Sequence, residues 1–283
     1  MNKPIKVIFS DLDGTLFHGG SDSCIITKEN EDAIHRWTEA GNRFIIATGR
    51  PSSIKDELVE KHHIECDILA CNGAKVILDD KILWSKEVGP QETKEIMDIC
   101  EPYGDQVDFA LDMDWIEWVV FKRNGLVEKK HSDAFFNTTV KQYLSEERDM
   151  YANKIYMVCA SQSVKSELME KLTEHFKDRL SVTSSGYDNI ELMCPGIAKD
   201  KAVVTLLKLL NLEIDQAAAI GDEVNDLTML KCIPYGFVMS SAREEIRKQI
   251  PRQMDSVADL IDWCLNHNEK PFRNTHNSGF MIQ

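Results

Sequence analysis

The sequence predicts an α/β protein: a parallel sheet core with helices on both faces, interrupted by an inserted α+β cap domain. Up to residue 71, short apolar runs rich in β-branched residues alternate with amphipathic stretches, which is typical of parallel strands joined by crossover helices. The same alternation returns after Pro195-Gly196. Between the two blocks the pattern changes to helices and paired strands, which indicates an antiparallel layer.

The first block is expected to hold three buried parallel strands and two helices. The strands are the short apolar runs at 6–10, 43–48 and 67–71. Thr27 can serve as the N-cap of the helix after the first strand, and Gly41 ends that helix. Pro51 is expected in the first turn of the second helix, where its missing N–H costs nothing.

The middle block is expected to contain two hairpins, over Asp79-Asp80 and over Gly186, together with amphipathic helices. Its expected elements are two strands within 75–85, a helix at 91–101, an antiparallel pair within 109–122, a strand at 154–160, a helix at 163–176 and strands at 180–185 and 189–194. The last block is expected to contain a helix at 199–211, a strand at 217–220, a helix ending near 232, a strand at 236–239 and helices at 242–249 and 257–265.

These elements divide the chain into four segments. The expected bounds are 1–84 for the first part of the core, 85–195 for the inserted cap, 196–266 for the second part of the core and 267–283 for a polar C-terminal tail. In open parallel sheets, ligands bind outside the carboxyl ends of the strands. The site is therefore expected at the strand ends of the two core parts.

Composition and charge narrow the possible functions. The chain has 283 residues and a formal net charge of −14, which opposes binding to nucleic acid or to an anionic membrane surface. No apolar run approaches the ~20 residues of a membrane-spanning helix, and the apolar stretch at the N-terminus is too short for a signal peptide. The eight cysteines form no CxxC pair, so we expect a cytoplasmic protein with reduced thiols. The sequence leaves the oligomeric state open between a monomer and a homodimer.

Polar or small residues stand directly after the core strands or at the start of the helix after the insertion. They are Asp11, Asp13, Gly14, Thr48, Gly49, Arg50, Asn72, Gly73, Lys199, Asp222, Asn225 and Asp226. Because the carboxyl ends of parallel strands lie at one edge of a sheet, these residues are expected to converge.

The acids among them indicate a metal site. Asp11 and Asp13 are two positions apart in an extended segment, so their side chains point to the same side. Such carboxylates repel each other unless a cation or a proton intervenes, and Asp222 adds a third. All-oxygen ligation suits Mg²⁺, which would also attract an anionic substrate to a protein of net charge −14. Lys199 and the backbone N–H groups near Thr48–Pro51 are suited to phosphate oxygens.

In order along the chain, DLDGT at 11–15, the ATGR segment, Lys199 and GDEVND at 221–226 resemble the four motifs of the haloacid dehalogenase-like (HAD) phosphatases. The long insertion between the second and third motifs resembles the C2B cap of the Cof-type branch, and NGA at 72–74 also fits that branch. DxDGT together with GDxxND is a highly specific combination. The fold that the resemblance implies is a Rossmann-like core with an α+β cap.

The activity that the resemblance implies is Mg²⁺-dependent hydrolysis of a phosphomonoester through an aspartyl-phosphate. The substrate would be a small phosphorylated metabolite, such as a sugar phosphate. Asp11 would attack phosphorus as the nucleophile. Asp13 would protonate the leaving alkoxide and then deprotonate the hydrolytic water. Gly14 would permit the turn that exposes both acids.

The resemblance also implies roles for the other residues. Mg²⁺ would be held by Asp11, the backbone carbonyl of Asp13 and Asp222, with Asp226 acting around the metal or through water. Thr48 and Lys199 would bind the transferring phosphoryl oxygens. The substrate side would further include Gly14, Gly49, Arg50, Asn72, Gly73 and Asn225.

The chain departs from the family pattern at three places. Asp200 follows Lys199 where the family usually has glycine, and Ser240-Ser241-Ala242 replaces a Gly-Asn-Ala loop. The strand usually found before the last helix is expected to be missing. These departures leave the four motifs intact.

Three other functions stay open. A phosphomannomutase-like enzyme would return the phosphoryl group to the sugar, a receiver-like phospho-acceptor would keep it, and a binding protein would not transfer it. Release of free phosphate separates all three from a phosphatase.

Overall fold

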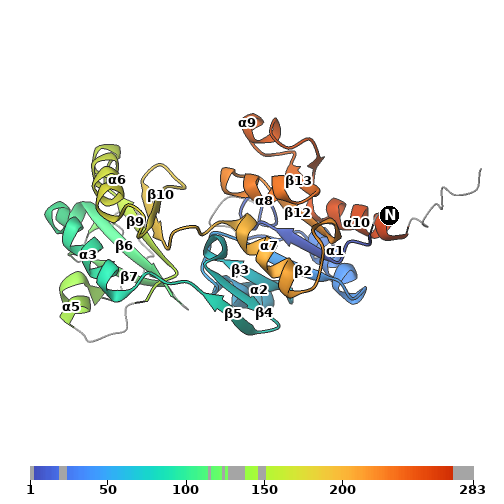
Figure 1. Cartoon of the computed structure of the whole chain (residues 1–283), viewed down its shortest axis with the longest axis horizontal. Helices are drawn as coiled ribbons and strands as arrows, with labels where there is room; N and C mark the ends of the chain where they lie inside the picture. The colour runs from blue at the N-terminus through green and yellow to red at the C-terminus, as the bar shows by residue number, and fades with distance from the viewer. Residues whose placement is uncertain are drawn as a thin grey trace, which may run out of the picture. The chain divides into compact units, whose positions relative to one another are not determined.

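The computed structural model describes residues 3–18, 24–113, 116–122, 125–126, 138–145 and 151–269. The described strands and helices are β1 (Val7–Ser10), α1 (Lys28–Glu39), β2 (Arg43–Ala47), α2 (Ile54–His62), β3 (Asp67–Ala70), β4 (Lys75–Leu78), β5 (Lys81–Ser85), α3 (Pro90–Cys100), β6 (Val107–Asp112), β7 (Ile116–Val120), β8 (Thr138–Thr139), α5 (Val140–Ser145), β9 (Lys154–Cys159), α6 (Gln162–Phe176), β10 (Ser181–Thr183), β11 (Asn189–Met193), α7 (Lys199–Leu209), β12 (Ala217–Gly221), α8 (Leu227–Cys232), β13 (Tyr235–Met239), α9 (Glu244–Arg247), β14 (Gln253–Met254) and α10 (Val257–Glu269) (Figure 1).

The larger sheet has eight strands in the order β14-β13-β12-β1-β2-β3-β4-β5. The pairs β1–β12, β12–β13 and β13–β14 are parallel, whereas β3–β4 and β4–β5 are antiparallel. The predicted α/β class with a parallel sheet core is confirmed, and the antiparallel strands form one end of the sheet.

The parallel pair that leads to the acidic residues is fully buried. Val7, Ile8 and Phe9 of β1 pair in register with the alanines of β12, and all of these side chains are inaccessible to solvent. Strands buried on both faces contain apolar residues without polar alternation, as both of these do. Their rigidity fixes the point at which each strand ends.

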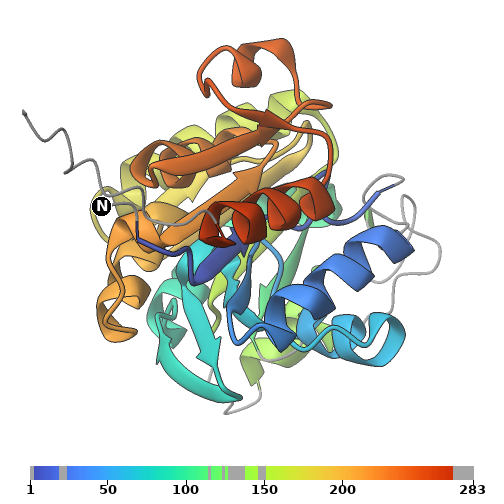
Figure 2. The same ribbon diagram turned by 90° about the vertical axis from the view of Figure 1, so that its right-hand side faces the viewer.

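Helices α1 and α10 lie side by side (Figure 2). Buried Asn30 joins them, because its Oδ1 accepts a hydrogen bond of 2.9 Å from the N–H of Ala258. The predicted N-cap of α1 is confirmed, since the Thr27 hydroxyl accepts from the N–H of Asn30. Gly41 follows the end of this helix with a φ of +76°.

The second sheet has six strands in the order β10-β11-β9-β6-β7-β8. Apolar residues on one of its faces pack with α3 and α6 in a single core (Figure 1). The alternation of β6 and β9 turns their other residues to the opposite face, which therefore includes Asp108, Asp112 and Lys154. These three polar residues are also buried.

The predicted hairpin over Asp79-Asp80 is confirmed. Both residues have a left-handed backbone, with φ of +49° and +58°, as a two-residue turn between antiparallel strands requires. The predicted antiparallel pairs β6–β7 and β10–β11 are also confirmed.

Two expectations about elements are wrong, and two elements were not expected. Helix α2 begins at Ile54, and Pro51 instead starts a turn whose i→i+3 hydrogen bonds lead into it. A short strand, β14, does precede the last helix and pairs with β13 through Val238↔Gln253 and Met239↔Met254. The sequence also gave no indication of β8 and α5. The greater part of the predicted tail lies outside the described residues.

The chain forms two compact units: unit 1 comprises 1–45 and 204–283, and unit 2 comprises 46–203. The bounds of these units differ from those expected for the core and the cap, which stay predictions. In the described part of the chain, no helix has the length and apolar character needed to cross a bilayer.

Candidate active site

In unit 1, backbone pairing places two acids side by side. The N–H of Asp11 donates to the carbonyl of Ile220 at 2.9 Å, which extends the β1–β12 pairing by one residue. Asp222 follows β12 directly, so it stands on the neighbouring strand at the same edge. The Asp11 residue is only 6% exposed.

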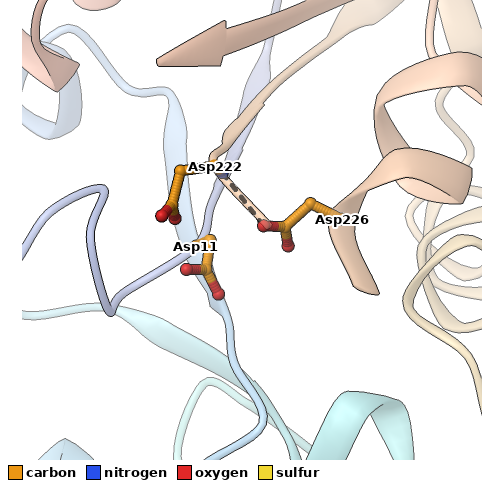
Figure 3. A group of neighbouring side chains, drawn as sticks. All are labelled: Asp11, Asp222 and Asp226. Carbon is orange, nitrogen blue, oxygen red and sulfur yellow. Dashed lines mark hydrogen bonds between the residues drawn. The ribbon is translucent and has the colours of Figure 1, made fainter. Parts of the chain in front are cut away.

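Three carboxylates gather at this edge (Figure 3). One oxygen each from Asp11, Asp222 and Asp226 lie within 4.8 Å of one another. Thr15 Oγ1 donates to Asp222 Oδ1 at 2.9 Å and holds that side chain in place. Carboxylates so close together repel one another without a cation or a proton between them. Three hard oxygen donors fit a divalent cation such as Mg²⁺, so this acidic group is a candidate metal centre.

Two glycines make room for the acids. Gly14 has a φ of +80°, and a Cβ built on it would lie 2.3 Å from Asp222 Oδ2. A Cβ on Gly221 would lie 2.5 Å from the Cγ of Asp226. Any side chain at either position would push a carboxylate away, so both glycines are needed for close approach, and Gly14 also for its left-handed backbone.

Asp226 is fully buried at the end of a 3₁₀ turn. Its Oδ2 accepts from the backbone N–H of Asp222 at 3.1 Å and from that of Glu223 at 3.0 Å (Figure 3 shows the first of these bonds). These bonds compensate part of the buried charge and fix the segment that carries Asp222. Asp226 therefore acts on the acidic group through the backbone as well as through its own carboxylate.

The remaining predicted site residues of unit 1 are Asp13 and Asn225. Asp13 is partly exposed, and among the described residues its carboxylate is not one of the three that gather. The expectation that its backbone carbonyl faces a metal stays a prediction. Asn225 lies in the 3₁₀ turn and is exposed.

In unit 2, Thr48 is fully buried directly after β2. Its hydroxyl accepts from the N–H of Arg50 at 3.0 Å, so the hydroxyl's own proton is left to point toward another acceptor. Its N–H donates to the carbonyl of Leu69 at 2.9 Å. Gly49 packs against the Asn72 side chain, which a Cβ would meet at 3.4 Å.

The segment after β3 turns sharply beneath α7. Asn72 has a φ of +55° and Gly73 a φ of +99°. A Cβ on Gly73 would lie 2.6 Å from the Cβ of Ala202, so glycine lets this turn touch the helix that begins at Lys199. Lys199 itself is only 1% exposed. Unit 2 thus brings the 48–50 segment together with Asn72, and the 71–73 turn with the start of α7.

Two of the backbone N–H groups expected to bind an anion are engaged within the protein. The N–H groups of Thr48 and Arg50 already donate to Leu69 and to the Thr48 hydroxyl, and Pro51 has no N–H. The helix after this segment also begins later, at Ile54. The Thr48 hydroxyl is therefore one polar group that this segment offers, and anion binding by its remaining N–H groups stays a prediction.

Sequence reasoning missed Lys154, which contacts the same segment. Its Nζ donates to the carbonyl of Gly49 at 2.8 Å. The one signal in the sequence is a lysine at the first position of an otherwise apolar strand, which is also common where a lysine simply faces solvent.

Comparison with known protein families matches residues 8–260 to the haloacid dehalogenase-like hydrolases. The chain belongs to this family. The family predicted from the four motifs is therefore confirmed.

Two curated relatives of this HAD hydrolase are named as phosphatases. The 5-amino-6-(5-phospho-D-ribitylamino)uracil phosphatase of Bacillus subtilis is 26% identical over 269 residues, which cover 93% of this chain and 95% of the relative. The HMP-PP phosphatase of Cronobacter sakazakii is 22% identical, over 91% of this chain and 94% of the relative.

A solved structure shows the same fold. The haloacid dehalogenase-like hydrolase from Bacteroides thetaiotaomicron is 22% identical and superposes with a TM-score of 0.80, covering 92% of this chain and 99% of that one. The HAD hydrolase described here therefore shares its architecture with a known member over nearly the whole length of both chains.

Proposed function

We propose that this HAD hydrolase is a Mg²⁺-dependent phosphomonoesterase that acts on a small phosphorylated metabolite through an aspartyl-phosphate. The observation that carries the proposal is the group formed by Asp11, Asp222 and Asp226, whose oxygens lie within 4.8 Å of one another at the ends of β1 and β12. Such a group is costly to assemble unless a cation balances it, and phosphoryl transfer relies on that kind of charge neutralisation.

In the first step, an Asp11 oxygen attacks phosphorus and the ester oxygen leaves with its electron pair. Asp13 gives its proton to that oxygen, so the alcohol departs neutral. In the second step, Asp13 takes a proton from water as the water attacks phosphorus. The bond to Asp11 breaks, inorganic phosphate forms and both acids return to their starting states.

The other proposed roles follow from the chemistry of each side chain. Mg²⁺ would be held by Asp11, Asp222 and the Asp13 carbonyl, with Asp226 supporting them, and when bound it would offset the negative charge of the carboxylates and the phosphoryl group. Thr48 would donate its hydroxyl proton, and Lys199 its ammonium protons, to phosphoryl oxygens.

The proposed substrate class is a sugar phosphate or a related polyol phosphate. The names of the curated relatives support a small phosphorylated substrate, since one of them is a phosphatase of a phosphoribityl compound. A cytoplasmic location is proposed on the same basis as the substrate class, from the small-metabolite phosphatases among the relatives.

The test is release of inorganic phosphate from a panel of sugar, polyol and nucleoside monophosphates, with Mg²⁺ and with a chelator. Wild-type protein is compared with Asp11→Asn and with a matched control, Asp178→Asn, which changes an exposed acid in the loop after α6. We expect metal-dependent release that Asp11→Asn abolishes and Asp178→Asn leaves unchanged.

Three other outcomes would each favour a different function. Conversion of a sugar phosphate to its isomer without phosphate release would favour the mutase. Stable phosphorylation of the Asp11 peptide without turnover, detected by mass spectrometry, would favour the phospho-acceptor. If folded, metal-loaded protein forms no isomer, is not phosphorylated and releases no phosphate from any compound, the binding-protein function would be favoured.

A further inference from the structure

Lys154 is a buried cation on the second sheet of unit 2. It is the first residue of β9, faces away from the apolar core of that sheet and is 7% exposed. Its Nζ lies 2.8 Å from the carbonyl oxygen of Gly49 and 3.2 Å from Oδ2 of Asp112, its cross-strand partner on β6. The ammonium is therefore shared between a carboxylate of the sheet and one backbone carbonyl.

Three successive carbonyls follow β2, and each accepts a hydrogen bond within unit 2. The carbonyl of Thr48 accepts from the N–H of Asn72 at 2.8 Å, and that of Arg50 accepts from the N–H of Cys71 at 2.9 Å. The donor to the middle carbonyl, that of Gly49, is a side chain, the ammonium of Lys154. The carbonyl of the Gly49–Arg50 peptide is therefore held by the Lys154 side chain, whereas the carbonyls of Thr48 and Arg50 accept from backbone N–H groups.

That peptide also orients Thr48. Its carbonyl oxygen accepts from Lys154, and its N–H, on Arg50, donates to Thr48 Oγ1 at 3.0 Å. Because a peptide unit is planar, fixing its oxygen fixes the direction of its N–H. A cation on the carbonyl also polarises the unit and strengthens the N–H as a donor. An unbroken chain of hydrogen bonds thus runs from the Lys154 ammonium to the Thr48 hydroxyl.

Lys154 is held in its charged form. Burial opposes the charge, but the carboxylates of Asp112 and Glu191 outweigh that effect and keep the pKa of Lys154 above its ordinary value. Glu191 is itself buried on β11, where it also accepts from the Ser185 hydroxyl. Burying an ammonium together with the carboxylates that compensate it costs free energy, and the apolar core of this sheet does not require that ion pair for its packing.

We propose that Lys154 is a positioning residue: its ammonium, anchored by Asp112, fixes the Gly49–Arg50 peptide and so aims the Thr48 hydroxyl at the phosphoryl group. This role rests on the proposed function, in which Thr48 binds a phosphoryl oxygen. Lys154 itself touches neither the phosphoryl group nor the leaving group.

The first measurement is amide hydrogen exchange, which reports on the loop whether or not the enzyme turns over. In Lys154→Met, exchange of the Arg50 amide should be about 10- to 100-fold faster, as expected when a charge-assisted hydrogen bond is lost. Tyr156→Phe is the matched control: Tyr156 lies two residues along the same strand and loses only its bond to Asn189 Nδ2. The control should leave the Arg50 amide unchanged.

The second measurement is kinetic. Lys154→Met should lower kcat by about 10- to 100-fold, the usual effect of a small misplacement in an active site. The loss should be the same for substrates with different leaving groups, and Lys154→Arg should restore part of it. Adding Lys154→Met to Thr48→Val should cost little more than Thr48→Val alone, because both changes remove the same interaction.

Several results would overturn the role. A loss that varies with the leaving group would make Lys154 a substrate contact, and full additivity with Thr48→Val would show that it does not act through Thr48. Unchanged exchange at Arg50 would remove the structural basis. If Lys154→Met does not fold, the double variant Lys154→Met/Asp112→Asn removes both charges of the pair and takes its place.

The failure of this role can be told apart from failure of the proposed function. Wild-type protein without metal-dependent phosphate release would refute the phosphatase, and the exchange measurement alone would then decide whether Lys154 holds the loop. Active wild-type protein with unaltered Lys154→Met kinetics would refute the positioning role alone.

Discussion

Replacing Gly14 with alanine should disrupt the acidic group of unit 1 without changing any charge. The new Cβ would start 2.3 Å from Asp222 Oδ2, and real Cβ atoms do not approach closer than 3.0 Å, so the contact must lengthen by about 0.7 Å. The Thr15 hydroxyl holds the other Asp222 oxygen at 2.9 Å, which restricts where the carboxylate can go. The substitution therefore moves a proposed metal ligand.

Two separate costs follow from Gly14→Ala. A left-handed backbone at a non-glycine residue costs about 1–2 kcal/mol of folding free energy. Disturbing the support of a metal ligand typically weakens metal binding about 10- to 100-fold. The second cost is specific to the acidic group, and the first is not.

Gly41→Ala separates the two costs. Gly41 has a similar φ, +76°, but a Cβ there would meet nothing within 4 Å. It should lose a similar amount of stability, visible as a fall of about 2–4 °C in Tm per kcal/mol, and keep its Mg²⁺ affinity. Titration calorimetry with Mg²⁺, together with thermal unfolding with and without Mg²⁺, measures both quantities. If Gly14→Ala binds Mg²⁺ as tightly as Gly41→Ala does, the assignment of Asp222 as a ligand is refuted.

Three further predictions concern stability and reactivity. Asp226→Ala should lower the free energy of unfolding by about 1–3 kcal/mol, measured by denaturant titration, because two backbone N–H groups lose their buried acceptor. Hydrogen bonds from Arg179 and then His175 lower the pKa of Glu95 from 4.5 to about 2. Its contribution to stability should therefore be complete above pH 4.5 and be lost as the pH falls toward 2, so that Glu95→Gln and wild type converge in unfolding experiments at low pH. Burial raises the pKa of the Cys71 thiol to about 12, so an aromatic disulfide reagent should label it in denatured protein and not in native protein.

Much of the fold could be predicted because local chemistry decides it. Thr27 predicted a cap and accepts the expected hydrogen bond, and Asp79-Asp80 predicted a turn and adopts the left-handed backbone that a two-residue hairpin needs. The buried strands were visible as uninterrupted apolar runs. For the cap and the turn, neighbours in the sequence supply the interaction that fixes the structure, whereas the strands are recognised by composition and fixed by pairing with distant strands.

The errors have other causes. Strand β14 has only two residues, too few for any periodicity, and it exists because β13 offers it backbone partners. The Pro51 turn depends on i→i+3 bonds that composition does not distinguish from the first turn of a helix. Lys154 meets Gly49 across more than a hundred residues of chain, so no local pattern contains that contact.

The first and last motifs are informative as a pair because their residues contact one another. Gly14, in the first motif, is needed because Asp222, in the last, occupies the space where its Cβ would be. Gly221 is needed because Asp226 occupies the corresponding space. An acid in a turn is common, and so is a glycine, but here each glycine is required by a carboxylate that the fold brings against it. The pair of motifs therefore encodes a contact between β1 and β12, which neither segment encodes alone, and Gly14→Ala tests that contact directly.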